Sequence, residues 1–191
     1  MSTLHASPMI DDCIRSVRKP RMRRLVLDDF EPDGDGILES QWAGFTDRVM
    51  GGRSDGSFSQ TSLLGKRCLR LTGDVTREGG GGFAQMAVRP GGPTGFFDLS
   101  AFAGLEVLAM GNNQHYNIHI RTADVAWYNQ SYRATFFAPA RWQKFCFAWS
   151  DFKPHGIDEP MDTSVIQRIG FLGWMREFRM DLAIGEVAFF A

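Results

Sequence analysis

The sequence predicts an all-β fold, an antiparallel β-sandwich of the jelly-roll type. Aromatic residues make up 13% of the chain and glycine occurs 21 times, a composition that favours short strands joined by tight turns. Roughly eight to ten short segments have strand-like patterns, and no long amphipathic helix interrupts them. A chain of 191 residues is long enough for one well-buried core.

The predicted strands of the first half lie between clusters of turn-forming residues. They are expected, in order, at residues 24–31, 57–64, 67–75 and 83–89. The second and third alternate well enough to form a hairpin. The fourth follows a run of four glycines and ends before Pro90. Residues 99–111 fit either a short helix or a loop followed by a strand, and Gly104 with the turn at 111–113 favours the strand.

The second half contains the clearest strand patterns. Strands are expected at residues 116–122, 131–137 and 141–152, in the last part of 161–174, and at 178–190. A short helical turn capped by Asp162 or Thr163 is expected to begin the segment 161–174. Gly185 marks a bulge or bend in the last strand.

Two neighbouring strands give the predicted sheet one apolar and one polar face, because side chains alternate across a strand. The apolar set, which we expect to face the core, consists of Tyr116, Ile118, Ile120, Tyr132, Ala134 and Phe136. The opposite set includes Asn117, His119, Arg121, Ser131, Arg133 and Thr135. Arginines are rarely buried against protein without a partner. The sheet is therefore expected to expose one polar face to solvent.

Charge divides the chain into two parts. Residues 1–24 carry six basic and two acidic side chains, whereas residues 25–191 carry 15 basic and 20 acidic ones. We expect residues 1–24 to be a basic, flexible tail and residues 25–191 to form the folded domain. The tail could meet a membrane surface. The acidic body lacks the cationic field that nucleic-acid binding needs.

The three cysteines suit a reducing compartment, and the hydropathy of the chain argues against a membrane span. Cys13, Cys68 and Cys146 form no zinc or redox motif. The last two lie in apolar strand patterns, where cysteine behaves as a small hydrophobe. The sequence has neither a recognisable secretory signal nor an apolar run long enough to span a bilayer. We therefore expect a cytoplasmic protein that does not span a membrane.

The sequence contains no recognisable catalytic constellation. It lacks a P-loop, an HExxH motif, a GxSxG motif and any Cys/His cluster. His115 and His119 would share one face of a strand but lie roughly 13 Å apart, too far to hold one metal ion. We therefore expect a protein that is not an enzyme and needs no cofactor.

The segment FTDRVMGGRSDGSF, residues 45–58, has a structural interpretation. Asp47 would accept backbone N–H groups as an Asx turn, and Met50 would fill the core. Gly51 and Gly52 would supply the positive φ angles that a crossover between two sheets requires. In the alternative, functional interpretation, Arg48 or Arg53 clamps an anion while the glycines admit a ligand close to the backbone.

This segment also closely resembles the signature of the CIA30 family, relatives of an assembly factor of mitochondrial NADH:ubiquinone oxidoreductase. The matching positions are Asp47, Val49, Met50, Gly51, Gly52 and Ser54. The resemblance spans roughly residues 25–191 and includes the segments GGGGFAQM, YNIHIRT and SYRATFFAPARWQKFCFAWSDFKP. Thr46 stands where the family would have Asn, and the chain lacks the long N-terminal extension of the mitochondrial members. It therefore looks like a compact bacterial relative.

The resemblance implies a galactose-binding-domain-like jelly roll, a fold that carbohydrate-binding modules also use. It further implies a role in assembling respiratory complex I through protein–protein contacts. A bacterial relative need not share that role. Related sandwiches often carry a structural calcium ion, for which the candidate ligands are Asp28, Asp29, Glu31 and Glu186. Ordinary solvated carboxylates are the alternative.

The polar face also has two interpretations, a solvated surface or a binding surface. The candidate binding residues are Asn117, His119, Arg121 and Arg133, with Trp127 and Tyr128 from the adjoining loop. Such aromatic side chains can anchor a protein partner or stack on a sugar ring. The leading hypothesis is a binding module for a protein partner, and the alternative is a carbohydrate- or small-ligand-binding module. Trp42, Trp142, Trp149 and Trp174 are interpreted as core or rim packing.

Overall fold

The computed structural model describes residues 23–34, 36, 41–91 and 95–191. In these ranges the chain forms twelve β-strands and four short 3₁₀ turns, and it contains no α-helix. It therefore has, in the same ranges, no helix long and apolar enough to cross a bilayer. Residues 1–22 of the predicted basic tail lie outside the described residues. Arg24, which belongs to both the predicted tail 1–24 and the predicted strand 24–31, begins the first strand.

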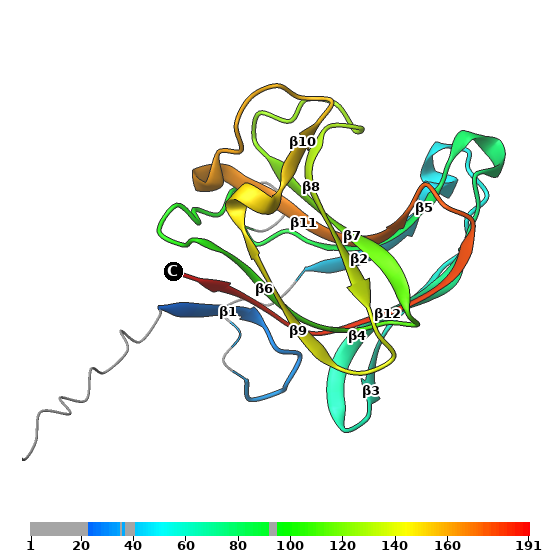
Figure 1. The fold of residues 1–191 in the computed structure, drawn as a ribbon, viewed down its shortest axis with the longest axis horizontal. Helices are drawn as coiled ribbons and strands as arrows, with labels where there is room; N and C mark the ends of the chain where they lie inside the picture. The colour runs from blue at the N-terminus through cyan, green and yellow to red at the C-terminus, as the bar shows by residue number, and fades with distance from the viewer. Residues whose placement is uncertain (1–22, 35, 37–40, 92–94) are drawn as a thin grey trace, which may run out of the picture.

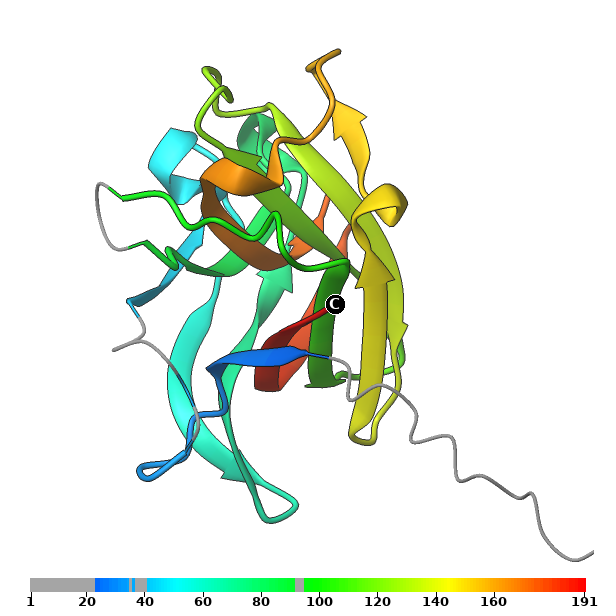
Figure 2. The ribbon, with the colours of Figure 1, turned by 90° about the vertical axis from the view of Figure 1, so that its left-hand side faces the viewer.

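The strands form two antiparallel six-stranded sheets that lie face to face (Figures 1 and 2). The first sheet has the order β3-β4-β12-β6-β9, and β1 pairs with the free edge of β12 beyond β4. Its strands are β1 (Arg24–Asp28), β3 (Ser57–Leu63), β4 (Lys66–Val75), β6 (Gly104–Met110), β9 (Gln143–Ala148) and β12 (Phe178–Phe190).

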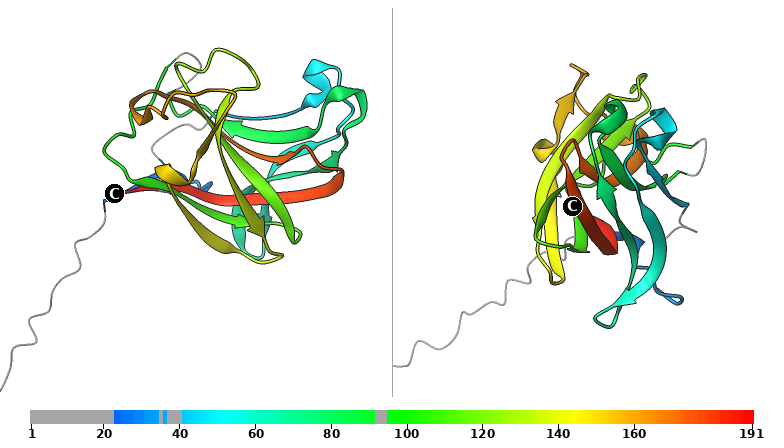
Figure 3. Two further views of the ribbon diagram at one scale, coloured as in Figure 1. Left: turned by 45° about the horizontal axis from the view of Figure 1, so that its top comes forward. Right: turned by 90° about the vertical axis from the view of Figure 1, so that its right-hand side faces the viewer.

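The second sheet has the order β10-β8-β7-β11-β5-β2. Its strands are β2 (Trp42–Thr46), β5 (Phe83–Val88), β7 (Gln114–Thr122), β8 (Ser131–Ala138), β10 (Lys153–His155) and β11 (Ile166–Trp174). The 3₁₀ turns are η1 (Asp47–Met50), η2 (Glu78–Gly80), η3 (Trp149–Asp151) and η4 (Thr163–Val165). Figure 3 shows how strands of both sheets twist across the sandwich.

The predicted all-β sandwich is confirmed, and so are most of its local features. The segment that fitted a helix or a strand is the strand β6. Asp162 caps η4 by accepting the amide of Ser164 at 2.9 Å. The register of β12 against β6 shifts between Ile184 and Glu186, which places a bulge at Gly185.

The core lies between the sheets and is built from the predicted apolar set. Tyr116, Ile118 and Ile120 of β7 are fully buried, and Phe136 of β8 packs beside Tyr116. Burying each of these side chains stabilises the fold by about 2 kcal/mol. The alternate residues of both strands therefore point out of the sandwich, as the sequence predicted.

One cysteine does not behave as the sequence predicted. Cys146 is exposed on β9, with its Sγ atom 3.8 Å from Glu106. The adjacent Phe145 and Phe147 point inward instead and pack with Phe136. The aromatic residues of this strand take the apolar side because they bury more surface than a thiol. Cys68, by contrast, is buried as expected.

The predicted crossover between the sheets is built on the buried carboxylate of Asp47. The turn η1 leaves β2 of the second sheet and leads to β3 of the first. The Asp47 carboxylate accepts the amide and hydroxyl of Ser54 at 2.9 and 2.6 Å. It also accepts the amides of Gly82 and Phe83 at 2.5 and 3.2 Å. These are long-range bonds and not the local Asx turn that the sequence predicted.

The glycines around Asp47 have two different functions. Gly51 has a φ of 89° and ends η1 in the left-handed conformation, which agrees with the predicted positive φ. Gly52 and Gly81 provide space instead, because a Cβ atom on either residue would lie 2.3 or 2.2 Å from the Asp47 carboxyl group. Thr46, where the family would have Asn, caps η1 by accepting the amide of Arg48 at 3.3 Å.

Met50 does not fill the core. Its side chain is half-exposed, because the Asp47 carboxylate and its hydrogen-bond donors occupy the inward side of the turn. Met50 therefore stands at the outer surface of the molecule.

We expect Asp47→Asn to lower the free energy of unfolding by roughly 3 kcal/mol, because an amide group would turn an N–H donor toward buried N–H donors. Burial alone raises the pKa of Asp47, but hydrogen bonds from Ser54, Gly82 and Phe83 hold it below its ordinary value. The carboxylate therefore stabilises the native protein above about pH 4, and this stabilisation is lost as the pH falls through the lowered pKa. Urea denaturation at pH 7 and at pH 3 measures both effects.

The matched control is Asp74→Asn, which changes an exposed carboxylate on β4. Its free energy of unfolding should change by less than about 0.5 kcal/mol. Equal effects of the two substitutions would contradict the assignment of a structural role to Asp47.

Candidate functional site

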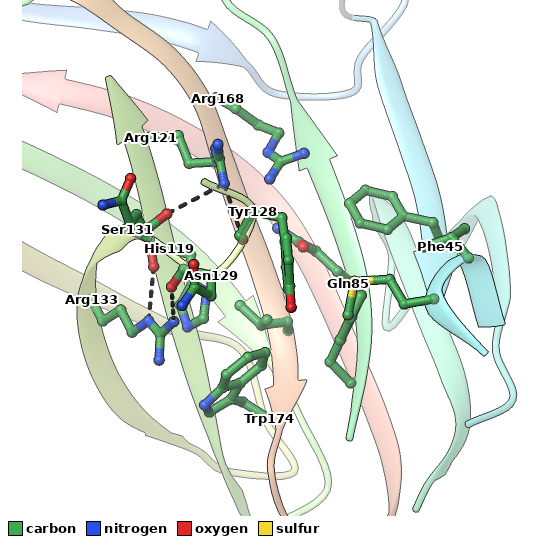
Figure 4. Close-up of a pocket in the computed structure, with 15 residues that line it drawn as sticks. Phe45, Gln85, His119, Arg121, Tyr128, Asn129, Ser131, Arg133, Arg168 and Trp174 are labelled. Carbon is green, nitrogen blue, oxygen red and sulfur yellow. Dashed lines mark hydrogen bonds between the residues drawn. The ribbon is translucent and has the colours of Figure 1, made fainter. Parts of the chain in front are cut away.

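The outer face of the second sheet is hollowed into a pocket of about 230 Å³. Figure 4 shows the side chains that line it. Its floor comes from four strands and consists of Phe83, Gln85, His119, Arg121, Ser131, Arg133, Arg168, Leu172 and Trp174. Phe45, Val49 and Met50 form one wall, and Tyr128, Asn129 and Gln130 form the opposite one. This pocket is the candidate functional site.

Strand register brings the floor residues together. Gly170 of β11 lies opposite His119 of β7, which in turn lies opposite Arg133 of β8. On its other side, β11 places Leu172 opposite Gln85 of β5. A Cβ atom at Gly170 would lie 1.6 Å from the Gln85 amide nitrogen, so the glycine leaves the space that this side chain occupies.

Arg121 holds the wall formed by residues 125–130. One guanidinium nitrogen donates to the carbonyls of Trp127 and Tyr128, both at 3.0 Å, and it also reaches the carbonyl of Gln130 at 3.3 Å. The other donates to the carbonyl of Val125 at 3.3 Å. Burial lowers the pKa of Arg121, with a further contribution from Arg89. The hydrogen bonds of Arg121 therefore go to the loop, and its predicted contact with a ligand stays a prediction.

Arg133 is also anchored, but less completely. Its guanidinium donates to the Ser131 hydroxyl at 2.8 Å and to the Asn129 carbonyl at 2.9 Å. It lies over the ring of Trp174, 4.6 Å from the centroid, a distance typical of a cation–π interaction. Burial lowers the pKa of Arg133 to about 10, so the side chain stays charged at neutral pH.

Arg168 has no hydrogen bond or ion pair with any residue that the structure describes. Its guanidinium lies 5.6 Å from the centroid of the Phe45 ring. Burial, followed by the charges of Arg121 and Arg89, lowers its pKa to about 10. The residues lining the described pocket include no carboxylate. Within the described ranges, no carboxylate of the pocket compensates the positive charge of Arg168.

His119 lies on the floor with only 8% of its surface exposed. Its Nε2 atom has no hydrogen-bond partner within the described chain, and its ring meets the Trp174 ring edge-on at 5.1 Å. Burial lowers the pKa of His119 to about 3, with further contributions from Arg133, His155 and Arg168. The imidazole is therefore neutral at physiological pH and has one unused polar atom.

The other predicted binding residues lie around the pocket or away from it. Tyr128 lines the pocket, and Trp127 is exposed next to it. Asn117 lies outside the pocket and donates a hydrogen bond to the Thr135 hydroxyl at 2.7 Å. Arg48 donates to the Ser54 carbonyl at 3.1 Å, and Arg53 reaches Glu78 at 3.5 Å. Both arginines line a separate shallow groove. Their anion-binding role stays a prediction.

Sequence reasoning missed Arg168, Gln85 and Phe45, and it interpreted Trp174 only as packing. A signal for two of them was present, because Arg168 and Trp174 occupy alternate positions of one strand with Gly170 and Leu172 between them. Alternation puts all four on one face. The contribution of Gln85 depends on the pairing of β5 with β11, which the sequence pattern does not specify.

The four calcium candidates are engaged by other groups of the protein. Asp28 accepts the Trp42 indole at 2.9 Å, Glu31 pairs with Lys66 at 2.8 Å, and Glu186 pairs with Arg24. Asp29 accepts the amide of Glu31 at 3.1 Å. The described ranges contain no group of three His, Cys, Asp or Glu side chains arranged to hold a metal ion.

The two sheets form a jelly-roll β-sandwich with a hollow on the outer face of the second sheet. The chain belongs to the CIA30 family, whose model, described as complex I intermediate-associated protein 30, matches residues 32–183. The predicted family and fold are therefore confirmed. A search among curated proteins finds no match.

Several solved structures share this fold. The family 11 carbohydrate-binding module of the cellulosomal cellulase Lic26A-Cel5E of Clostridium thermocellum is 14% identical, with a TM-score of 0.67 over 87% of this chain and 94% of that chain. A family 11 module from Clostridium thermocellum in complex with a β-1,3-1,4-mixed-linked tetrasaccharide has a TM-score of 0.64, with the same sequence identity and the same coverage of both chains. The family 30 module of the cellulase Cel9D-Cel44B of Clostridium thermocellum is 13% identical, with a TM-score of 0.60 over 87% of this chain and 96% of that chain. At these identities the likeness concerns the fold alone.

We expect His119 to make the protein less stable in mild acid. Its pKa is about 3 in the native state and about 6.5 in the unfolded chain, so the unfolded state binds more protons between these values. Stability present at pH 7 is therefore lost as the pH falls below about 6.5, by about 2 kcal/mol at pH 5. Urea denaturation at the two pH values measures the loss.

His119→Gln should remove this part of the pH dependence, whereas His115→Gln, which changes an exposed histidine of the same strand, should retain it. Imidazole chemical shifts should show His119 neutral down to about pH 4. Protonation of His119 near pH 6 in the native protein would contradict the expectation.

Proposed function

We propose that this protein is a non-catalytic binding module that engages a protein partner through the pocket of its second sheet, in the assembly of respiratory complex I. The complex I role is supported by membership of the CIA30 family. The binding site is supported by one observation, the combination of an apolar, exposed rim with a cationic interior that contains hydrogen-bonding groups.

The rim has the composition of a protein interface. Val49 and Met50 are exposed on one wall, and Tyr128 is exposed on the other with Trp127 beside it. Aromatic residues, methionine and arginine are enriched where proteins meet. Large exposed aromatic side chains around a pocket are typical anchors for a partner. These features support a protein contact centred on the pocket.

The chemistry of the pocket supports binding without turnover. The residues lining it within the described chain include neither a carboxylate nor a thiol. Ser131 is hydrogen-bonded to Arg133, and the neutral His119 has no hydroxyl partner to activate. General acid–base catalysis needs a positioned donor or acceptor with a pKa near the working pH, and none of these groups meets that condition.

Affinity capture from the native host tests the proposal. We expect the wild-type protein to enrich complex I subunits, and the double variant Met50→Asp/Tyr128→Ala to reduce this enrichment by at least about tenfold, because it removes two rim contacts. Quantitative mass spectrometry measures the ratio.

The matched control is Leu64→Asp, which changes an exposed apolar residue at the β3–β4 turn, outside the residues that line the pocket. This variant should enrich the same subunits as the wild type. Enrichment without any complex I subunit, or equal capture by all three proteins, would contradict the proposal.

A carbohydrate ligand is the second candidate, and the exposed rings of Trp127 and Tyr128 favour it. Aromatic faces of this kind can stack on a sugar ring. If this function is correct, the protein binds an oligosaccharide on a glycan array, and Trp127→Ala weakens binding at least about tenfold. Phe96→Ala, which removes another exposed ring, serves as control. An array without any bound glycan would contradict this candidate.

A further inference from the structure

Among the residues that the structure describes, Arg168 has no hydrogen-bond or ion-pair partner for its side chain, which lines the pocket. Two partly exposed arginines elsewhere in the protein, Arg24 and Arg70, pair with carboxylates. Arg70, for example, forms a bidentate pair with Asp181 at 2.8 and 2.6 Å. Arg168 is more deeply placed, yet within the described residues its only assigned contact is the ring of Phe45. A desolvated cation of this kind is stabilised by any anion that reaches it.

The other charges of the pocket add to this effect. Arg121 and Arg133 face the same hollow, and both donate to backbone carbonyls or a hydroxyl but to no carboxylate. In Figure 4 the guanidinium groups of Arg121 and Arg168 lie at one end of the pocket, and Arg133 with His119 lies at the other. The floor is therefore cationic along its length, without a counter-charge from the residues that line it.

A second, independent observation comes from His119. Its side chain is more than nine-tenths buried, faces the pocket and leaves Nε2 without a partner in the described chain. A buried polar atom without a hydrogen bond is normally satisfied by water or a ligand. A neutral imidazole can donate an N–H bond to an oxygen atom. The pocket therefore offers a polar atom for a ligand oxygen as well as a charge.

The apolar side chains narrow the class of ligand. Phe45, Phe83 and Leu172 line the same pocket as Arg168, so a group bound there meets apolar surface as well as charge. A planar carboxylate matches the two parallel N–H donors of a guanidinium. A carboxylate on an apolar stem fits this environment better than a phosphate, which is fully polar on all sides.

We propose that the pocket is a carboxylate-binding site in which Arg168 is the residue that selects the anion. The inference rests on the proposed function, in which the carboxylate belongs to an acidic residue or the C-terminus of the protein partner. A free organic acid has the same chemistry, and the experiment below separates the two sources.

The first arm uses 3-phenylpropanoate as the probe and 3-phenylpropanamide as its neutral counterpart. Titration of the isotope-labelled full chain, followed by NMR signals of the Arg168 side chain, should show millimolar binding of the acid and at least about tenfold weaker binding of the amide. Arg168→Gln should weaken binding of the acid at least about tenfold, whereas Arg168→Lys, which keeps the charge without the fork, should lose less.

The control variant is Arg141→Gln, which changes an exposed arginine that is not among the pocket residues and should bind the probe like the wild type. Arg168→Gln breaks no side-chain hydrogen bond of the described chain, so the melting temperature of this variant should equal or exceed that of the wild type. Such a result would exclude unfolding as the cause of weaker binding. Equal binding of acid and amide, or unchanged binding of the acid by Arg168→Gln, would overturn the inference.

The second arm repeats the capture experiment with Arg168→Gln. Loss of the captured subunits, together with loss of probe binding, supports a carboxylate supplied by the partner. Probe binding that depends on Arg168 while capture does not would support the carboxylate site and assign it to a free organic acid. Because the first arm needs no partner, it can succeed even where the complex I proposal fails.

Discussion

The buried carboxylate of Asp47 is the interaction on which the candidate site depends. It joins the turn between β2 and β3 to the segment that leads into β5, through donors on Ser54, Gly82 and Phe83. Figure 1 shows these two connections side by side at one end of the sandwich. Four hydrogen bonds to one charged group compensate its removal from water. They also fix the position of Val49 and Met50, which form one wall of the pocket.

The polar groups of the pocket differ from Asp47 in that two of them lack hydrogen-bond partners among the described residues. Asp47 is fully satisfied, whereas Arg168 and the Nε2 atom of His119 lack partners in the described chain. A partly buried cation without a counter-charge and a buried polar atom without a hydrogen bond both lower the stability of a protein, and such groups are often found where a ligand binds. The two groups therefore differ in function: the Asp47 carboxylate maintains the shape of the turn, whereas Arg168 remains available for recognition.

The family and the fold could be predicted from the sequence because both depend on local patterns. Alternation in residues 116–122 and 131–137 placed His119, Arg121 and Arg133 on the same outer face, and the structure confirms that all three line one pocket. The same rule would also have placed Arg168 there. These residues lie in regular strands, where sequence position determines side-chain direction.

What could not be predicted depends on contacts between distant segments. Met50 is exposed because Asp47 draws its donors from residues 82 and 83, which no local pattern of the turn reveals. The hydrogen bonds of Arg121 go to four carbonyls of a folded loop, which no strand pattern reveals. The place of Gln85 depends on the missing Cβ atom of Gly170. Register, loop geometry and buried hydrogen bonds decide these positions.

Because Arg121 holds the loop through backbone atoms, the side chains of Trp127 and Tyr128 can change without altering the conformation of the loop. Its shape is fixed through the backbone carbonyls of Val125, Trp127, Tyr128 and Gln130, and every amino acid supplies a carbonyl. The side chains of Trp127 and Tyr128 are exposed, that of Tyr128 lines the pocket, and neither takes part in these bonds. They can therefore be exchanged while the loop keeps its conformation. A library that randomises these two positions would change the specificity of the pocket on a constant scaffold.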